Sequence, residues 1–213
     1  MSTVAVVDYG MGNLRSVEQA LRHVAGEQSV IVTSDPAEVH AARRVVFPGQ
    51  GAMPDCVREL DARGLRQPVL DAAANKPFLG ICIGLQMLFE HSEEGDAAGL
   101  GILPGQVRRF ASGMRDAKGD KLKVPHMGWN EVRQSRVHPL WAGIAPDARF
   151  YFVHSYFVET ADAALETAYT EYPARFTSAV GQDNIFAVQF HPEKSQQAGL
   201  SLLFNFVNWD GRP

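Results

Sequence analysis

Phe78-Leu79-Gly80-Ile81-Cys82-Ile83-Gly84 is the stretch that decides the fold of this 213-residue chain. Its apolar beginning predicts a buried strand, and the small residues on both sides of Cys82 permit a sharp turn from that strand into a helix. Such a turn, called a nucleophile elbow, holds its central side chain exposed. Because this side chain is a thiol, the stretch predicts a cysteine nucleophile at the end of a strand.

The base that such a thiol needs can come from Phe190-His191-Pro192-Glu193, which closes another apolar strand much later in the chain. A thiol must lose its proton before it attacks a carbonyl, and the imidazole of His191 can take that proton. Glu193 would lie on the first turn beyond the strand, where its carboxylate can hold the ring. A lone cysteine or histidine is more often structural, so the joint pattern carries the prediction of a triad.

A third motif, Phe47-Pro48-Gly49-Gln50-Gly51, forms a glycine-rich turn after another apolar strand. An acyl-transfer site needs backbone N–H groups that stabilise a developing oxyanion, and the elbow offers the N–H of Ile83. The N–H of Gln50 would be the second donor if the Gly49–Gln50 peptide points it inward, and flanking glycines make such a peptide easy to rotate. Three loops at three strand ends are therefore predicted to meet in one cleft.

Composition limits the classes of function. With 46% hydrophobic residues and a net charge of −4, the chain can bury one sizeable core, and one domain is predicted over residues 1–213. A basic stripe interleaved with aromatic residues is missing, which argues against a nucleic-acid partner. Two cysteines, Cys56 and Cys82, make no disulfide framework, and Met1 leads directly into a strand without a signal-peptide pattern. We expect a cytoplasmic protein with no membrane span and no metal site, because the histidines lack zinc-ligand spacing.

The pattern of apolar residues predicts an α/β fold, with a largely parallel central sheet flanked by helices and a β-rich second half. Strands are predicted at residues 3–7, 30–33, 44–47, 78–81, 107–110, 131–133, 150–158, 166–172, 176–180 and 185–190. Helices are predicted at 14–25 (opened by Asn13), from 36, and at 54–63, 65–74, 84–90 and 195–207. In parallel sheets of this kind, ligands bind beyond the carboxyl ends of the strands, where all three motifs lie.

The segment 80–86, Gly-Ile-Cys-Ile-Gly-Leu-Gln, together with His191-Pro192-Glu193, resembles the signature of the class I, triad-type glutamine amidotransferases over nearly the whole chain. Within that family, four further segments resemble the glutaminase subunits of imidazole glycerol phosphate synthases. These segments are Asp8-Tyr9-Gly10-Met11-Gly12-Asn13-Leu14, Pro125-His126-Met127-Gly128-Trp129-Asn130, Tyr151-Phe152-Val153-His154-Ser155-Tyr156 and Gln189-Phe190-His191-Pro192-Glu193-Lys194-Ser195.

The resemblance implies a reaction and a substrate site without a cofactor. Cys82 would attack the side-chain amide of glutamine, release ammonia and form a thioester that water then hydrolyses. The implied glutamine-binding residues are Gly49, Gly51, Gln86, His154, Ser155 and Tyr156. For His154 and Tyr156 the alternative is that they alternate with core residues along a strand.

The resemblance also implies a partner, a (β/α)₈-barrel cyclase subunit bound as a heterodimer, to which ammonia passes through a channel. The residues expected to face it are Asn13, Met127, Trp129 and Lys194. A tryptophan suits an interface hot spot, but it suits a core equally well. The cyclase would bind the phosphate-bearing substrate, because this chain carries neither a Walker motif nor a dinucleotide fingerprint.

Two alternatives remain at this point. One is a class I amidotransferase subunit that serves anthranilate or aminodeoxychorismate synthesis, and the other is a catalytically silent regulatory subunit. The segment 125–130 and Lys194 favour the histidine pathway over the first alternative. The presence of Cys82, His191 and Glu193 argues against the second.

Overall fold

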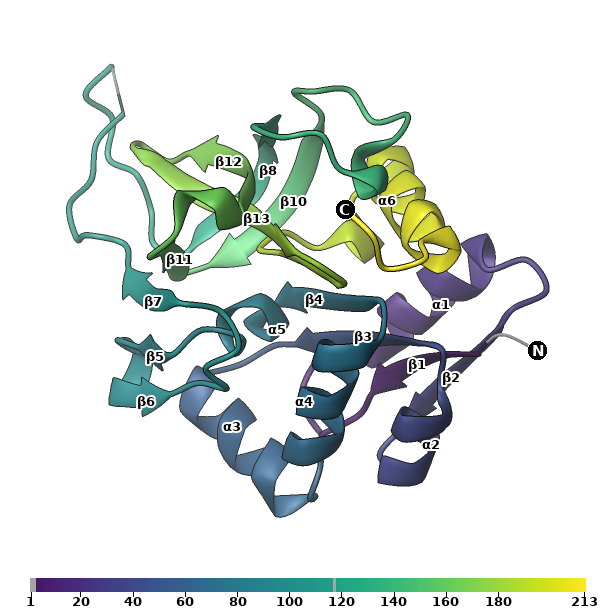
Figure 1. The fold of residues 1–213 in the computed structure, drawn as a ribbon. Coiled ribbons are helices and arrows are strands. Elements are labelled where there is room, and N and C mark those ends of the chain that lie inside the picture. The colour runs from purple at the N-terminus through teal and green to yellow at the C-terminus, as the bar shows by residue number, and fades with distance from the viewer. Residues whose placement is uncertain (1–2, 117) are drawn as a thin grey trace.

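The computed structural model describes residues 3–116 and 118–213. Parallel strands form the centre of its large sheet (Figure 1). Their spatial order is β2 (Ser29–Thr33), β1 (Thr3–Val7), β3 (Arg44–Gly49), β4 (Phe78–Cys82) and β14 (Ile185–Val188). Every residue of β4 and of β14 is buried, as expected for parallel strands covered on both faces.

Helices cover both faces of these parallel strands (Figure 1). One face carries α1 (Leu14–Val24) and α6 (Gln196–Asn208), which pack against each other. The other carries α2 (Pro36–Ala41), α3 (Met53–Ala62) and α4 (Arg66–Asn75). The helix starts follow from the sequence, because the side chains of Asn13 and Asp35 accept hydrogen bonds from the first turns of α1 and α2.

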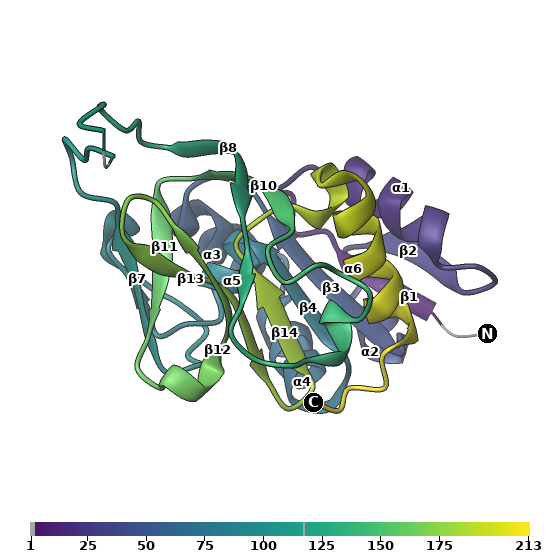
Figure 2. The ribbon, with the colours of Figure 1, turned by 90° about the horizontal axis from the view of Figure 1, so that it is seen from above.

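Antiparallel strands extend the sheet beyond β14, which confirms the predicted α/β fold with a β-rich second half. They are β13 (Arg175–Gln182), β11 (Tyr156–Thr160), β7 (Gly105–Arg109), β12 (Glu166–Glu171) and β9 (Arg133–Gln134). At the far edge, β5 (His91–Ser92) pairs in parallel with β7 and antiparallel with β6 (Ala97–Ala98). A separate two-stranded ribbon is formed by β8 (His126–Glu131) and β10 (Arg149–His154) (Figure 2). Short 3₁₀ helices span Glu94–Asp96, Pro139–Trp141, Ala163–Leu165 and Pro192–Lys194.

The strand predicted at residues 150–158 is divided in the structure. It breaks at Ser155, so that β10 joins the small ribbon and β11 joins the large sheet. The predicted strand at 131–133 is also wrong in extent, because β8 begins at His126. The two large apolar residues of β8, Met127 and Trp129, are exposed, and Gly128 has a φ of 131°, so the segment does not show the buried apolar alternation that marks a strand.

The helix predicted at 84–90 is a single turn, α5 (Ile83–Gln86). Backbone amides of residues 99–103 donate to the carbonyls of residues 87–90, for example Leu100 N to Met87 O at 2.7 Å and Ile102 N to Leu88 O at 2.8 Å. These carbonyls are therefore engaged by another loop and do not continue the helical ladder. None of the helices in the described ranges has the length and apolar character needed to cross a membrane.

Candidate active site

The elbow around Cys82 is built by close backbone packing. A Cβ atom on Gly84 would lie 1.8 Å from the carbonyl oxygen of Phe47 in β3, and one on Gly80 would lie 2.9 Å from the Cβ of Ala187 in β14. Cys82 itself has a φ of 56° and a ψ of −108°, which is a strained conformation for a residue with a side chain. The two glycines therefore allow neighbouring strands to press against the turn that holds the thiol.

Three neighbouring strands, β3, β4 and β14, deliver the predicted motifs to one edge of the sheet. Gly49 pairs with Cys82 in the parallel register of β3 and β4, and His191 follows β14 on the other side of β4. The Nδ1 atom of His191 lies 2.8 Å from the Oε1 atom of Glu193. The structure thus brings Cys82, His191 and Glu193 together, and each side chain is buried.

Ser195 fixes the turn that carries His191 and Glu193. Its hydroxyl donates to the carbonyl of His191 at 2.6 Å and accepts from the backbone N–H of Tyr151 at 3.0 Å. The N–H of His191 donates to the carbonyl of Tyr151 at 2.9 Å. The histidine is therefore held by β10 as well as by the end of β14.

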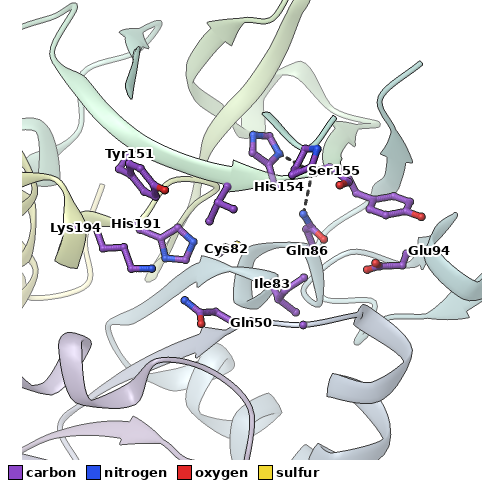
Figure 3. A pocket seen from close by; sticks show the side chains of 14 residues that line it. Gln50, Cys82, Ile83, Gln86, Glu94, Tyr151, His154, Ser155, His191 and Lys194 are labelled. Carbon is purple, nitrogen blue, oxygen red and sulfur yellow. Dashed lines mark hydrogen bonds between the residues drawn. The ribbon is translucent and has the colours of Figure 1, made fainter. Parts of the chain in front are cut away.

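The electrostatics of the triad favour a charged imidazole. Burial of His191 opposes protonation of its ring, but the Cys82 thiolate and the Glu193 carboxylate outweigh burial and raise the pKa of His191 to about 10. Its Nε2 atom has no hydrogen-bond partner of normal geometry within the described ranges, and the ring lies beside Cys82 (Figure 3). This arrangement places a charged imidazole next to the sulfur of the nucleophile.

A pocket of about 480 Å³ opens beside the triad (Figure 3). Its lining includes Gln50, Gly51, Cys82, Ile83, Gln86, Glu94, Tyr151, His154, Ser155, Tyr156, His191 and Lys194. Most of the predicted binding residues are in this set, whereas Gly49 lies behind the turn, between Tyr9 and Ile83. In Figure 3, Lys194 and Glu94 lie on opposite sides of the pocket, so its two ends carry opposite charges.

Two buried amides connect the pocket with the thiol. The Nε2 group of Gln86 donates to the carbonyl of Tyr156 at 3.0 Å and to the Oε1 atom of Gln189 at 3.1 Å. The Nε2 group of Gln189 in turn lies 3.9 Å from the Cys82 sulfur, in donating geometry. The Oε1 atom of Gln86 is buried and has no partner within the described ranges, so a residue of the pocket lining carries an unpaired acceptor.

The side chain of His154 is engaged by internal hydrogen bonds. Its Nδ1 donates to the carbonyl of Tyr156 at 2.7 Å, and its Nε2 lies 2.9 Å from Nδ1 of His126. Burial and the neighbouring His126 lower the pKa of His154 to about 3, so the ring is neutral. Its ring therefore orients the backbone of Tyr156, while the break at Ser155 brings this segment to the pocket.

Sequence reasoning missed two residues of the site. Glu94 comes from residues 91–106, where no helix or strand is predicted, and its Oε2 atom accepts from the backbone N–H of Met53 at 2.8 Å. Gln189 stands inside the motif that ends with Ser195, but only the parallel pairing of β14 with β4 places it beside Cys82. Within the described ranges, no group of three or more His, Cys, Asp or Glu side chains is arranged to hold a metal ion.

The family described as "Glutamine amidotransferase class-I" matches residues 5–209. This chain belongs to the class I glutamine amidotransferases. Curated relatives of this amidotransferase include two proteins named "Imidazole glycerol phosphate synthase subunit HisH". The protein from Aromatoleum aromaticum is 69% identical over 98% of this chain and 99% of its own length. The protein from Nitrosospira multiformis is 68% identical, again over 98% of this chain and 99% of its own length.

Solved structures share the fold of this amidotransferase at much lower identity. One described as "Crystal structure of glutamine amidotransferase" has a TM-score of 0.72 at 16% identity and covers 97% of this chain and 99% of its own. "Structure of PurLQS from Thermotoga maritima" has a TM-score of 0.71 at 18% identity and covers 97% of this chain and 98% of its own. At these identities the likeness supports the fold alone.

Three of the residues predicted to face a partner gather beside the pocket of the amidotransferase. Met127 and Trp129 lie on β8 and are exposed by 62% and 39%. The ring of Trp129 meets that of Tyr151 edge-on with centroids 6.2 Å apart, and the Lys194 ammonium lies 5.9 Å from the Tyr151 ring centroid. Exposed apolar side chains thus continue directly into the pocket lining.

Asn13 lies at the start of α1 and is not part of the pocket lining. Its Oδ1 atom accepts from the Ser16 N–H at 3.4 Å, and its Nδ2 donates to the Ser16 hydroxyl at 2.8 Å. The side chain is half-buried and borders the same small cavity as Gln50, His191 and Glu193. Its visible role is to cap the helix.

Proposed function

We propose that this chain is the glutaminase subunit of an imidazole glycerol phosphate synthase and forms one amidotransferase domain. It hydrolyses glutamine to glutamate and ammonia and passes the ammonia to a cyclase subunit in histidine biosynthesis. The observation that carries this proposal is the Cys82–His191–Glu193 cluster, at the ends of β4 and β14, in a chain 69% identical to a named HisH protein. The family match over residues 5–209 supports the single domain.

The mechanism follows from the charge state of the cluster. The Cys82 thiolate attacks the side-chain amide carbon of glutamine, and the His191 imidazolium protonates the leaving nitrogen, so that ammonia departs from a γ-glutamyl thioester. Neutral His191 then takes a proton from a water molecule, which attacks the thioester. Glutamate leaves, and the thiolate–imidazolium pair is restored. Glu193 holds the Nδ1–H of the ring throughout.

The oxyanion of each tetrahedral intermediate is stabilised by the backbone N–H groups of Ile83 and Gln50. The pairing of Gly49 with Cys82 supports this assignment, because it places the glycine-rich turn next to the nucleophile. A Cβ atom on Gly12, in the loop after β1, would lie 3.6 to 3.8 Å from the Gly49–Gln50 peptide, so this loop packs against the turn. The Gly49–Gln50 peptide is the activity switch of the site: it changes conformation when the cyclase and its ligand are bound, and flanking glycines make such a rotation easy.

Glutamine binds with its α-ammonium group toward Glu94 and the free Oε1 atom of Gln86. Both groups line the pocket, and both can accept hydrogen bonds from an ammonium. Ser155 and Tyr156 add backbone groups to the same wall. This orientation directs the side-chain amide of glutamine toward Cys82.

Glu94→Gln is expected to raise KM for glutamine by about tenfold to a hundredfold, because a hydrogen bond between charged groups becomes one to a neutral amide. The change should leave kcat within a few-fold, since the ammonium contact is the same in the ground state and the transition state. A glutamine at this position can still accept from the Met53 N–H. Steady-state glutamate release checks the result, with Glu93→Gln as the control because Glu93 faces solvent and pairs with Arg108. An unchanged KM would contradict the assignment of Glu94.

The cyclase partner is a (β/α)₈ barrel that forms a heterodimer with this chain and docks on the surface beside the pocket. Support comes from the exposed Met127 and Trp129, which continue into the pocket through Tyr151 and Lys194. Ammonia released into water would mostly be protonated and lose its nucleophilicity. A sealed interface with an internal channel is therefore required. Asn13 is the least supported interface residue, because its side chain caps α1.

Trp129→Ala should weaken cyclase binding by about thirtyfold or more, the loss typical of a tryptophan hot spot. Titration of the chain with the cyclase subunit, followed by calorimetry, measures the dissociation constant. Val137→Ala is the matched control, because Val137 is also an apolar surface residue, 98% exposed, and lies outside this pocket. Equal affinities for the two variants would remove Trp129 from the interface.

The test of the function is glutamate release by the purified chain, alone and with a cyclase subunit plus its ribulosyl aminoimidazole carboxamide nucleotide. Strong stimulation by the pair supports the proposal. Glutaminase activity that ignores the cyclase would favour a different synthase, such as one of anthranilate or aminodeoxychorismate. Absence of activity under both conditions would favour a silent subunit.

A further inference from the structure

A buried polar pair that the triad does not use lies beneath the glycine-rich turn. Tyr9 follows β1, Cys56 belongs to α3, and both side chains are fully buried. The two groups interact with each other, and Cys82 is near enough to influence both electrostatically. Buried polar groups without a structural or catalytic assignment need an explanation.

Cys56 is bonded to the turn itself. Its thiol donates to the backbone carbonyl of Gln50, with the sulfur 3.7 Å from the oxygen. This carbonyl belongs to the peptide that directly follows the Gly49–Gln50 peptide. The thiol therefore holds the peptide that follows the proposed oxyanion donor, the N–H of Gln50.

Tyr9 packs against Gly49, at the other end of the Gly49–Gln50 peptide. A Cβ atom on Gly49 would lie 2.1 Å from the Tyr9 hydroxyl oxygen, so that the hydroxyl fills the space that any side chain would take. Within the described ranges, this hydroxyl has no hydrogen bond of normal geometry, and its interaction is with the Cys56 thiol. Tyr9 and Cys56 thus enclose the Gly49–Gln50 peptide from its two ends.

Both groups keep their protons at neutral pH. Burial raises the pKa of Tyr9 well above its ordinary value, and it also raises the pKa of Cys56 to about 11. A tyrosine hydroxyl that donates to the sulfur leaves the single thiol proton free for the Gln50 carbonyl. The hydrogen bond from the Cys56 thiol to the Gln50 carbonyl is therefore compatible with a neutral Tyr9 hydroxyl beside the sulfur.

We propose that Tyr9 and Cys56 are positioning residues that hold the oxyanion turn in its resting conformation. The Cys56 thiol restrains the Gln50 carbonyl, and the Tyr9 hydroxyl orients that thiol. The inference rests on the proposed function, in which the turn changes conformation when the cyclase and its ligand are bound. Removing the restraint raises the basal rate and leaves the fully stimulated rate unchanged, because stimulation already populates the active conformation.

The experiment compares glutamate release by wild type and variants, alone and with the cyclase subunit plus its nucleotide. Cys56→Ala is expected to raise the basal kcat about fivefold, the shift produced by loss of one neutral hydrogen bond. The stimulated kcat and KM for glutamine stay within about twofold, so that the stimulation ratio falls about fivefold. Cys56→Ser, which restores a donor, keeps the wild-type ratio.

Tyr9→Phe raises the basal rate by about twofold, because the thiol loses only its orienting partner. The double variant Tyr9→Phe/Cys56→Ala shows no more effect than Cys56→Ala alone, since both changes act through one thiol. Val57→Ala is the matched control, a truncation of a half-buried side chain on the same helix. It leaves the stimulation ratio unchanged.

Several outcomes overturn the inference. They are an unchanged stimulation ratio in Cys56→Ala, an equal loss of basal and stimulated rates, or the same result for Cys56→Ser and Cys56→Ala. Stimulation of the wild-type chain by the cyclase shows whether the positioning role or the proposed function has been rejected. A wild type that the cyclase stimulates, with an insensitive Cys56→Ala variant, rejects only the positioning role. A wild type that ignores the cyclase rejects the proposed function, and the basal rates of the variants then test the restraint on their own.

Discussion

Cys82→Ser abolishes glutamine-dependent turnover, with kcat for glutamate release lower by about 10⁴-fold or more, the scale of loss seen when a triad nucleophile is removed. A hydroxyl at this position remains protonated beside His191, and the site then has no reactive anion. The fold should be retained, because serine is close to cysteine in size and the strained backbone is supported by packing around Gly80 and Gly84.

Two measurements on the cyclase complex test this prediction. Turnover by the cyclase complex with glutamine should disappear, whereas turnover with added ammonium salt should continue, because only the nucleophile has been removed. Cys56→Ser is the control, since it makes the same chemical change at the other cysteine of the chain and should keep glutaminase activity. Persistent glutamate release by Cys82→Ser would remove Cys82 as the nucleophile.

His191→Ala should reduce kcat nearly as much as loss of Cys82, and Glu193→Gln should reduce it roughly tenfold to a hundredfold less. His191 moves protons in both half-reactions, whereas Glu193 acts on the remote ring nitrogen, 2.8 Å from Nδ1. Steady-state glutamate release by the chain with its cyclase measures both variants. Equal losses would show that Glu193 does more than orient the ring.

The pH dependence of Cys82 alkylation tests the charge of His191 directly. Its pKa is raised to about 10, so the imidazolium is present at every pH below that value. Iodoacetamide should therefore react with Cys82 faster in the wild type than in His191→Ala across that range, because the imidazolium stabilises the attacking sulfur anion. Mass spectrometry distinguishes Cys82 from the buried Cys56. Identical profiles in wild type and variant would contradict the ion pair.

Much of this site could be predicted because its chemistry lies at the ends of strands that alternate with helices. That alternation fixes a parallel sheet, and a parallel sheet brings the loops of β3, β4 and β14 to one edge. The residues of the elbow and the His-Pro-Glu turn could therefore be placed from the sequence. Their separations, and the buried state of Glu193, could not.

The residues that escaped prediction depend on contacts without a local pattern. Glu94 reaches the pocket because the loop at residues 99–103 takes the carbonyls of residues 87–90 and ends α5 early. Gln189 reaches Cys82 only through the pairing of β14 with β4. The division of one predicted strand at Ser155 places β10 and β11 in different sheets, and hydrophobic alternation is the same on both sides of such a break.

The elbow contains two kinds of residue, those that the fold requires and one that only the activity requires. A side chain on Gly84 would overlap the backbone of β3, so a change there is eliminated together with the fold. A change at Cys82 meets no such barrier, because the residue already carries a side chain in its strained position. The two glycines are therefore required by the fold, whereas the cysteine is required only by the activity. Related proteins that have lost the activity should keep Gly80 and Gly84 but not Cys82.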